Sequence, residues 1–256
     1  MLRNLYEYRE MVRSLVIRDL RGRYKNSALG FLWTFLNPLF QLIIYTIVFT
    51  VIMPMNIDQY YIHLFVALVP WIFFSSCLTG GARAILDQQD LIKKIYFPRE
   101  ILPISFTTSQ FINMVLSMIV TFLIIMISGH GVSGMALLYL PIVLLIQYVL
   151  CVGVVMICSA ITVYLRDMEM VFGVIAFGWM YLSPVIYPES YIPEKYRSLY
   201  YLNPMSGIIS AYRKILYYKE IPEMSNLLIS VAFGIAALVL GIIVFHRLER
   251  HFVEEL

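Results

Sequence analysis

Six long apolar stretches decide what this chain of 256 residues can fold into. A helix needs about 20 apolar residues to cross a hydrocarbon layer of about 30 Å. Apolar residues make up 61% of the sequence and charged residues 14%, so a water-soluble core would leave large apolar patches exposed. We therefore predict an all-α membrane protein, a single domain over residues 1–256 with six transmembrane helices. The expected spans are Leu29–Met53, Tyr61–Ala82, Ile104–Ile127, Leu137–Val163, Val171–Ile186 and Leu227–Phe245.

The distribution of Lys and Arg predicts the orientation of these spans. The N-terminal segment carries seven such residues and the second connection carries Lys93, Lys94 and Arg99, whereas the first and third connections carry none. Because basic connections tend to stay in the cytoplasm, both termini are expected there. The fifth connection, residues 187–225, is then placed outside although it also contains five basic residues.

Residues 1–25 predict an amphipathic interface helix at the cytoplasmic surface. Leu5, Val12 and Leu15 recur on one face at helical spacing, and charged residues lie opposite. Such a helix is expected to lie among lipid headgroups with its apolar face down. It either anchors the first span only, or also offers a docking site or a grip on a phosphate-bearing substrate.

The second connection, residues 86–100, predicts a short helix just outside the membrane. Asp87 is placed to cap its first turn and Pro98 to end it. The helix either lies back on the lipid or inserts into a groove of another protein. Its apolar ridge consists of Leu91, Ile92 and Ile95.

Polar side chains run along one quarter of the first span. Amides in hydrocarbon are costly without partners, so this stripe must face protein or water. It either holds neighbouring helices together or lines a path for a polar solute. The aromatic residues beside it favour a lining role, because aromatic rings pack against the C–H faces of sugars. The stripe consists of Ser27, Thr34, Asn37, Gln41 and Tyr45, and a similar stripe in the third span consists of Gln110, Asn113, Ser117 and Thr121.

Two further patterns predict local structure. The pair Asn203-Pro204 indicates a helix start within residues 187–225, with the Asn side chain as its cap. One face of the sixth span carries only small residues, which predicts close packing of that face against another helix. These residues are Ser230, Gly234, Ala237 and Gly241.

The sequence contains no motif for catalysis or energy conversion. It lacks the G-x-x-x-x-G-K-[ST] loop that binds ATP, and its G-x-G-x-x-G match at 129–134 joins two apolar helices, which predicts a turn. No metal-binding spacing links its His and Cys residues, and the net charge of +3 is too small to indicate nucleic-acid binding. We therefore expect no catalytic site, metal or cofactor, and any uphill transport must draw its energy from a partner.

Several segments resemble a known family. Residues 15–39 read LVIRDLRGRYKNSALGFLWTFLNPL and resemble the opening of the type-2 ABC exporter permeases that move cell-surface polysaccharides, including O-antigen and teichoic acid. The segments YLRD (164–167), SPVIYP (183–188) and YLNPM (201–205) look like later signatures of that family. With the chain length and the six-helix layout, the resemblance spans nearly the whole chain.

This resemblance implies a transport subunit, not an enzyme, in the bacterial cytoplasmic membrane. Such permeases form homodimers and bind two copies of a separate ATPase subunit, which holds the ATP and Mg. Short re-entrant helices within residues 187–225 would gate the exit on the outer side. Residues 86–100 would form the coupling helix, which would meet the ATPase through Asp87, Leu91, Ile92 and Ile95.

The resemblance also implies a substrate class, a polyprenyl-pyrophosphate-linked glycan. Its diphosphate would meet a basic rim made of Arg18, Arg21, Arg23 and Lys25. Its sugar chain would pass through a channel between the first and fifth spans, with an aromatic lining of Phe31, Phe35, Tyr45, Phe177 and Tyr181. From the polar stripe of the first span we add Thr34, Asn37 and Gln41 to the expected lining. An uncharged channel of amides and aromatic rings offers hydrogen bonds and stacking without a deep charged trap, so a sugar chain can slide.

Three other functions compete with this interpretation. A permease for a lipid or drug would bind apolar tails in its pore. A membrane enzyme acting on polyprenyl-linked sugars would need a carboxylate or His at membrane depth, which this sequence lacks. A structural membrane subunit would have no conduit at all.

Overall fold

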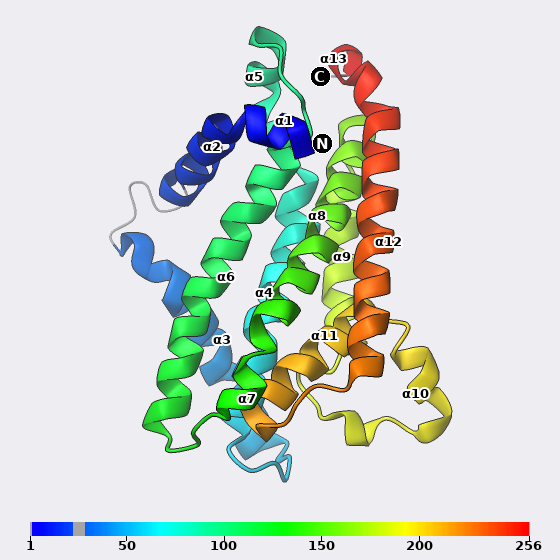
Figure 1. The fold of residues 1–256 in the computed structure, drawn as a ribbon. Coiled ribbons are helices and arrows are strands. Elements are labelled where there is room, and N and C mark those ends of the chain that lie inside the picture. The colour runs from blue at the N-terminus through cyan, green and yellow to red at the C-terminus, as the bar shows by residue number, and fades with distance from the viewer. Residues whose placement is uncertain (1, 23–28, 256) are drawn as a thin grey trace.

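The computed structural model describes residues 2–22 and 29–255 as a bundle of long helices whose connections lie mainly at its two ends (Figure 1). Helices account for 81% of the structure, and the described residues contain no strand, which confirms the all-α class. Both chain ends lie at the same end of the bundle, beside α1, α2 and α5 (Figure 1).

Among the described residues, five helical segments are long and apolar enough to cross a membrane. They are Gly30–Ile52, made of η1 (Gly30–Leu32), α3 (Trp33–Ile47) and η2 (Val48–Ile52); α4 (Tyr60–Ala82); α6 (Ile101–Ile127); Gly134–Tyr164, which includes α7 (Gly134–Leu137) and α8 (Leu140–Tyr164); and Met224–His251, which includes α12 (Met224–Leu248) and η6 (Glu249–His251).

With one exception, described in the next paragraph, the remaining helices are shorter and cluster at the ends of the bundle. At the end that carries the termini lie α1 (Leu2–Glu7), α2 (Arg9–Gly22), η3 (Leu86–Gln88), α5 (Gln89–Lys94) and α13 (Phe252–Glu255). At the opposite end lie η4 (Glu189–Tyr191), α10 (Glu194–Tyr200), α11 (Pro204–Arg213) and η5 (Lys214–Tyr218).

The predicted fifth span is a shorter helix than expected, α9 (Met168–Tyr181). It starts earlier than Val171 and ends well before Ile186, because Ser183 precedes Pro184 and a residue before proline avoids helical geometry. Its 14 residues extend about 21 Å, less than the hydrocarbon thickness. A layout of six crossings therefore stays a prediction.

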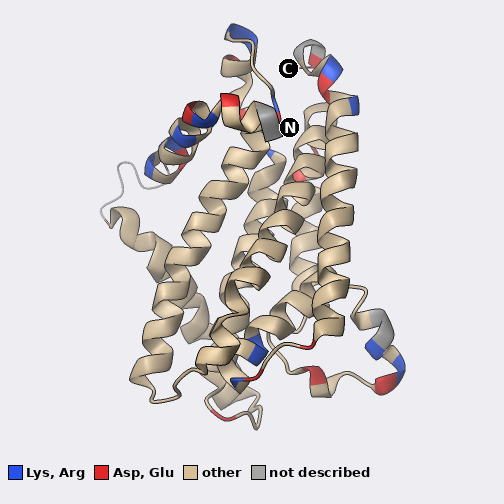
Figure 2. Cartoon of the chain, in the orientation of Figure 1, with Lys and Arg blue, Asp and Glu red and all other residues tan. Residues whose placement is uncertain are grey.

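Charged side chains gather at the two ends of the bundle and leave the middle of its long helices almost free of charge (Figure 2). This distribution fits helices whose central turns lie in hydrocarbon, where an unpaired charge is expensive. The end that carries the termini holds the charged residues of α2, the 83–100 segment and the end of α12.

The N-terminal helix differs from the expected interface helix in what covers its apolar face. Leu15 is 8% exposed and lies in a core cluster with Ile85 and Leu102, so α2 packs on the end of α6 instead of turning this face to lipid. Packing on the protein removes the apolar face of α2 from water, as insertion into the membrane interface would. The charged residues Arg13 and Arg21 remain exposed.

Three local predictions are confirmed. The small-residue face of α12 meets other helices at close range, since a Cβ built on Gly241 would lie 2.5 Å from the carbonyl oxygen of Gly153 in α8. Asn203 caps α11, because its side chain accepts a hydrogen bond from the Met205 backbone N–H at 3.0 Å. Residues 129–134 form a turn, in which Gly129 and Gly131 adopt positive φ angles of 70° and 72°.

We expect Gly153→Leu to destabilise the bundle by about 1–3 kcal/mol, because it overpacks the contact between α8 and α12. A Cβ at Gly153 would lie 2.3 Å from the carbonyl carbon of Ala237, which is backbone and cannot rotate away. Thermal unfolding of the purified protein measures the effect. Gly178→Leu is the matched control, since nothing lies within 4 Å of a Cβ there; equal losses in both variants would contradict this account.

Candidate functional site

The helices α3 and α9, which are distant in the sequence, line one groove together with α4. Asn37 and Gln41 of α3 and Phe177 of α9 line a groove of ≈ 360 Å³, which we call the α3–α9 groove. Within it the Gln41 Nε2 donates a hydrogen bond to the Asn37 Oδ1 at 3.1 Å. The structure thus brings three of the predicted channel residues together. Further lining comes from Trp71, Ile72, Ser75, Ser76, Thr79, Gly173, Ala176 and Met180.

The other aromatic residues predicted for the channel lie on α3 and α9 but outside the lining of this groove. The rings of Phe31 and Phe35 meet edge to face with centroids 5.4 Å apart, and those of Phe177 and Tyr181 do the same at 5.4 Å. The Tyr45 hydroxyl of α3 lies 3.9 Å from the Met180 Sδ of α9, so this contact links the two helices. Phe177 is 68% exposed, so this face of α3 and α9 is open in a single copy of the chain.

The first span, Gly30–Ile52, is less buried than the central helix α4. In its most apolar window 11% of the residues are buried, compared with 78% in α4. Asn37 is exposed on this span. Because an amide in hydrocarbon needs a hydrogen-bonding partner, this face requires either water or a second protein surface.

Thr34 and the polar stripe of α6 lie elsewhere. Thr34 is 7% exposed, and its backbone carbonyl accepts a hydrogen bond from the Ser117 hydroxyl at 3.2 Å. The Ser117 bond joins α6 to α3, and Gln110 and Thr121 are also buried. A small cavity of ≈ 110 Å³ remains between α3, α4 and α6, and its polar lining consists of Thr34, Asn37, Ser76, Gln110, Asn113 and Ser117.

Three hydroxyl-bearing residues of α4 also line the α3–α9 groove. The sequence analysis did not predict them. Ser75, Ser76 and Thr79 line it opposite Asn37 and Gln41. The signal was available, because positions three and four apart share one face of a helix. A Ser-Ser-x-x-Thr pattern inside an apolar span therefore marks a second polar stripe.

The 86–100 segment consists of η3, the two-turn helix α5 and an extended stretch. Asp87 does not cap α5, whose cap position is Gln88 without a side-chain hydrogen bond; instead Asp87 forms an ion pair with Arg83. Ile92 is 7% exposed and lies in a core cluster, whereas Ile95 is 56% and Tyr96 is 95% exposed. The exposed large apolar side chains of this segment are therefore Ile95 and Tyr96, and the sequence analysis missed Tyr96. A contact between this segment and an ATPase stays a prediction.

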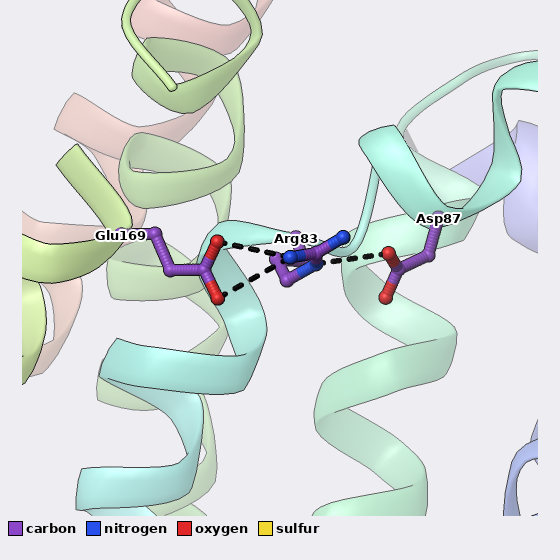
Figure 3. Close-up of polar contacts among 3 residues, drawn as sticks. All are labelled: Arg83, Asp87 and Glu169. Atoms are coloured by element: carbon purple, nitrogen blue, oxygen red, sulfur yellow. Dashed lines mark hydrogen bonds and ion pairs between the residues drawn. The ribbon is translucent and has the colours of Figure 1, made fainter. Parts of the chain in front are cut away.

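Arg83 bridges two carboxylates at this end of the bundle (Figure 3). Its Nε donates to the Asp87 Oδ1 at 3.0 Å, and its Nη1 donates to the Glu169 Oε2 at 3.1 Å. The hydrogen bond to Asp87, with the charges of both carboxylates, raises the pKa of the Arg83 guanidinium. Sequence reasoning had no signal for this contact, because 86 positions separate Arg83 from Glu169.

The expected basic rim is only partly described. Arg18 Nη2 donates to the Gln88 Oε1 at 2.5 Å, and Arg21 is exposed, whereas Arg23 and Lys25 lie outside the described residues. Arg18 borders a pocket of ≈ 290 Å³ that also contains the carboxylates of Asp19 and Asp87. A diphosphate at this place would meet negative as well as positive charge, so its binding by these residues stays a prediction.

The opposite end of the bundle is held by a buried cation. Arg213 of α11 is 3% exposed and donates to three backbone carbonyls, those of His63 at 3.3 Å, Tyr187 at 3.0 Å and Val185 at 2.7 Å. Burial lowers the pKa of Arg213 to about 10, which leaves it charged at neutral pH. Arg213 thereby ties α11 to the start of α4 and to the chain that leaves α9.

We expect Arg213→Met to lower the stability of the protein by about 2 kcal/mol or more, because three carbonyls lose a charged donor. Lys214→Met is the matched control. Lys214 is the next residue and forms a more exposed ion pair with Glu223, which contributes about 0–1 kcal/mol. Thermal unfolding in detergent, followed by Trp fluorescence, measures both variants. Similar losses in both would contradict the anchoring role of Arg213.

Comparison with known proteins places the chain in a family. A model of the family described as ABC-2 type transporter matches residues 10–217, which is most of the chain. The O-antigen export system permease protein RfbA of Myxococcus xanthus is 37% identical over 258 residues, covering 100% of this chain and 99% of that protein. RfbA of Klebsiella pneumoniae is 27% identical, covering 93% and 91%, and the polysialic acid transport protein KpsM of Escherichia coli is 23% identical, covering 98% of both. The chain therefore belongs to the ABC-2 type transporter family.

Proposed function

We propose that this chain is the membrane-spanning permease subunit of an ABC transporter that exports a polyprenyl-pyrophosphate-linked polysaccharide, such as O-antigen, across the bacterial cytoplasmic membrane. The names of its relatives support export of a polysaccharide. The observation that carries the proposal is the α3–α9 groove, in which amides, hydroxyls and aromatic rings line a surface that has no charged residue. Hydroxyl-rich chains form hydrogen bonds with such groups and stack on such rings.

In this proposal two copies of the chain face each other across α3 and α9. A single copy leaves Phe177 and Tyr181 exposed together with Asn37. A second copy would turn two half-open grooves into one conduit and remove these polar groups from lipid. We call residues 86–100 the coupling segment. The same symmetry would give two such segments and hence two bound ATPase subunits.

ATP and Mg would be bound by that ATPase subunit, and this chain would supply the conduit. The termini and the coupling segment, which share one end of the bundle, would lie in the cytoplasm. The end with α10 and α11 would then form the exit, with Arg213 holding α11 in place. The α9 helix, whose first turn contacts Arg83 and whose last turn contacts Asn203, would be the sixth crossing.

The test is to identify what accumulates in cells that lack this protein. We expect mass spectrometry of the cytoplasmic fraction to show a lipid-linked glycan, which disappears from the cytoplasm when the wild-type chain is restored. The ATPase subunit should copurify with the restored chain in a stoichiometric complex. Accumulation of a lipid or drug without a glycan, or an unchanged glycan distribution, would overturn the proposal.

A further inference from the structure

The Arg83 bridge joins elements with different expected roles. Asp87 lies in η3, which leads directly into α5, and Glu169 lies in the first turn of α9 (Figure 3). Arg83 itself follows the last turn of α4. One guanidinium therefore holds the coupling segment with its Nε and the start of a groove-lining helix with its Nη1.

The short helix η3 also contacts the N-terminal helix α2. Gln88 accepts a hydrogen bond from Arg18 of α2, one residue after Asp87. The turn η3 is thus connected by side chains to α2 on one side and, through Arg83, to α9 on the other. A displacement of α5 would pull on both connections, because α5 continues η3 without an intervening loop.

Folding stability does not explain this bridge. The Arg83 side chain is 51% exposed, and the side chains of Asp87 and Glu169 are 54% and 36% exposed. Ion pairs that water reaches so well contribute little to folding. Their geometry is nevertheless specific, because the guanidinium presents its donors in a rigid fork toward two separate acceptors.

We propose that Arg83 is a positioning residue for transport, which transmits movement of the coupling segment to α9 through Asp87 and Glu169. This inference rests on the proposed function, in which ATP hydrolysis in a partner drives movement at the α3–α9 groove. The first turn of α9 lies at Arg83 and Phe177 lies two turns further along the same helix, so a pull at Glu169 displaces the wall of the groove.

A double-mutant cycle in the complex with its ATPase subunit tests the bridge. We expect Arg83→Gln and Glu169→Gln each to reduce the glycan exported per ATP hydrolysed by about 5-fold or more, a typical size for coupling between sites. The double variant should be no worse than Arg83→Gln alone, because that change already removes the contact with Glu169. Arg166→Gln should export normally, because Arg166 is an exposed cation in the connection between α8 and α9, three residues before Glu169, and takes no part in the bridge.

A second readout does not depend on the glycan. Met170 is 75% exposed beside Glu169, and the native residues Cys77, Cys151 and Cys158 are buried, so a fluorophore on Met170→Cys reports on α9 alone. Adding ATP should shift its emission in the otherwise wild-type complex, and Arg83→Gln should abolish the shift while ATP is still hydrolysed. Additive losses in the cycle, release of the ATPase by Arg83→Gln, or a persisting shift would overturn the inference. A shift that depends on Arg83 in a complex that exports no glycan would instead refute the proposed substrate and leave this inference standing.

Discussion

Replacing Asn37 and Gln41 together with leucine is expected to reduce polysaccharide export by roughly 10- to 100-fold while the protein still folds and binds its ATPase subunit. The two amide side chains line the α3–α9 groove, and the Gln41 amide donates a hydrogen bond to the Asn37 amide oxygen there. Leucine has a similar size but offers a passing sugar no donor or acceptor. Each lost hydrogen bond costs about 1 kcal/mol net, and two of them give the range stated.

The measurement is export of labelled glycan in vesicles, together with the amount of assembled complex. Ser117→Ala is the matched control, since its hydroxyl also lies at membrane depth but contacts the carbonyl of Thr34 between helices. We expect it to keep export and to lose about 0.6 kcal/mol of stability, as for a contact between helices. If the leucine variant fails to fold while Ser117→Ala behaves normally, the amides hold the bundle together and do not line a conduit.

Changing Ile95 and Tyr96 to aspartate is expected to release the ATPase subunit and thereby stop export. These two side chains protrude at 56% and 95% exposure from the end of the bundle that carries the termini. Isolated exposed apolar side chains beside Lys93 and Lys94 suit an apolar pocket with an acidic rim. Loss of a central contact of this kind weakens binding by about 2 kcal/mol or more, which is roughly 30-fold.

Copurification and titration of the ATPase subunit measure this effect. Ile221→Asp is the control, because Ile221 is 51% exposed in the connection between η5 and α12, so the change replaces an exposed apolar residue with aspartate far from the coupling segment. It should leave the complex intact. Ile92→Asp is a poor test, since Ile92 is 7% exposed and an aspartate there would disturb the fold itself. A stoichiometric complex with the Ile95 and Tyr96 changes would show that the ATPase docks elsewhere.

The sequence predicts the long helices well because each carries its own signal. Span length and apolar composition are local properties, and so are the Asn203 cap, the glycine turn at 129–134 and the small-residue face of α12. The end of α9 was missed by several residues because apolar composition continues past the point where Pro184 interrupts the helix.

What the sequence could not predict depends on how helices turn toward each other. Thr34 and Asn37 belong to one polar stripe, yet the structure buries Thr34 beside α6 and opens Asn37 to the groove. Ile92 and Ile95 belong to one apolar ridge, yet only Ile95 is exposed. The contacts of Arg83 and Arg213 join segments far apart in the chain. The residue pattern of one segment does not predict which other segment it contacts.

The contact between Gly153 and Gly241 limits which parts of this protein can move. Where two backbones touch, neither helix can slide or rotate without a clash, so α8 and α12 must travel as one rigid unit. The first span is bound far less tightly, with a small buried share along its length. In a cycle of opening and closing, α8 and α12 would therefore keep their relative positions. The movement driven by ATP hydrolysis would be a tilt of α3 and α9 relative to this pair.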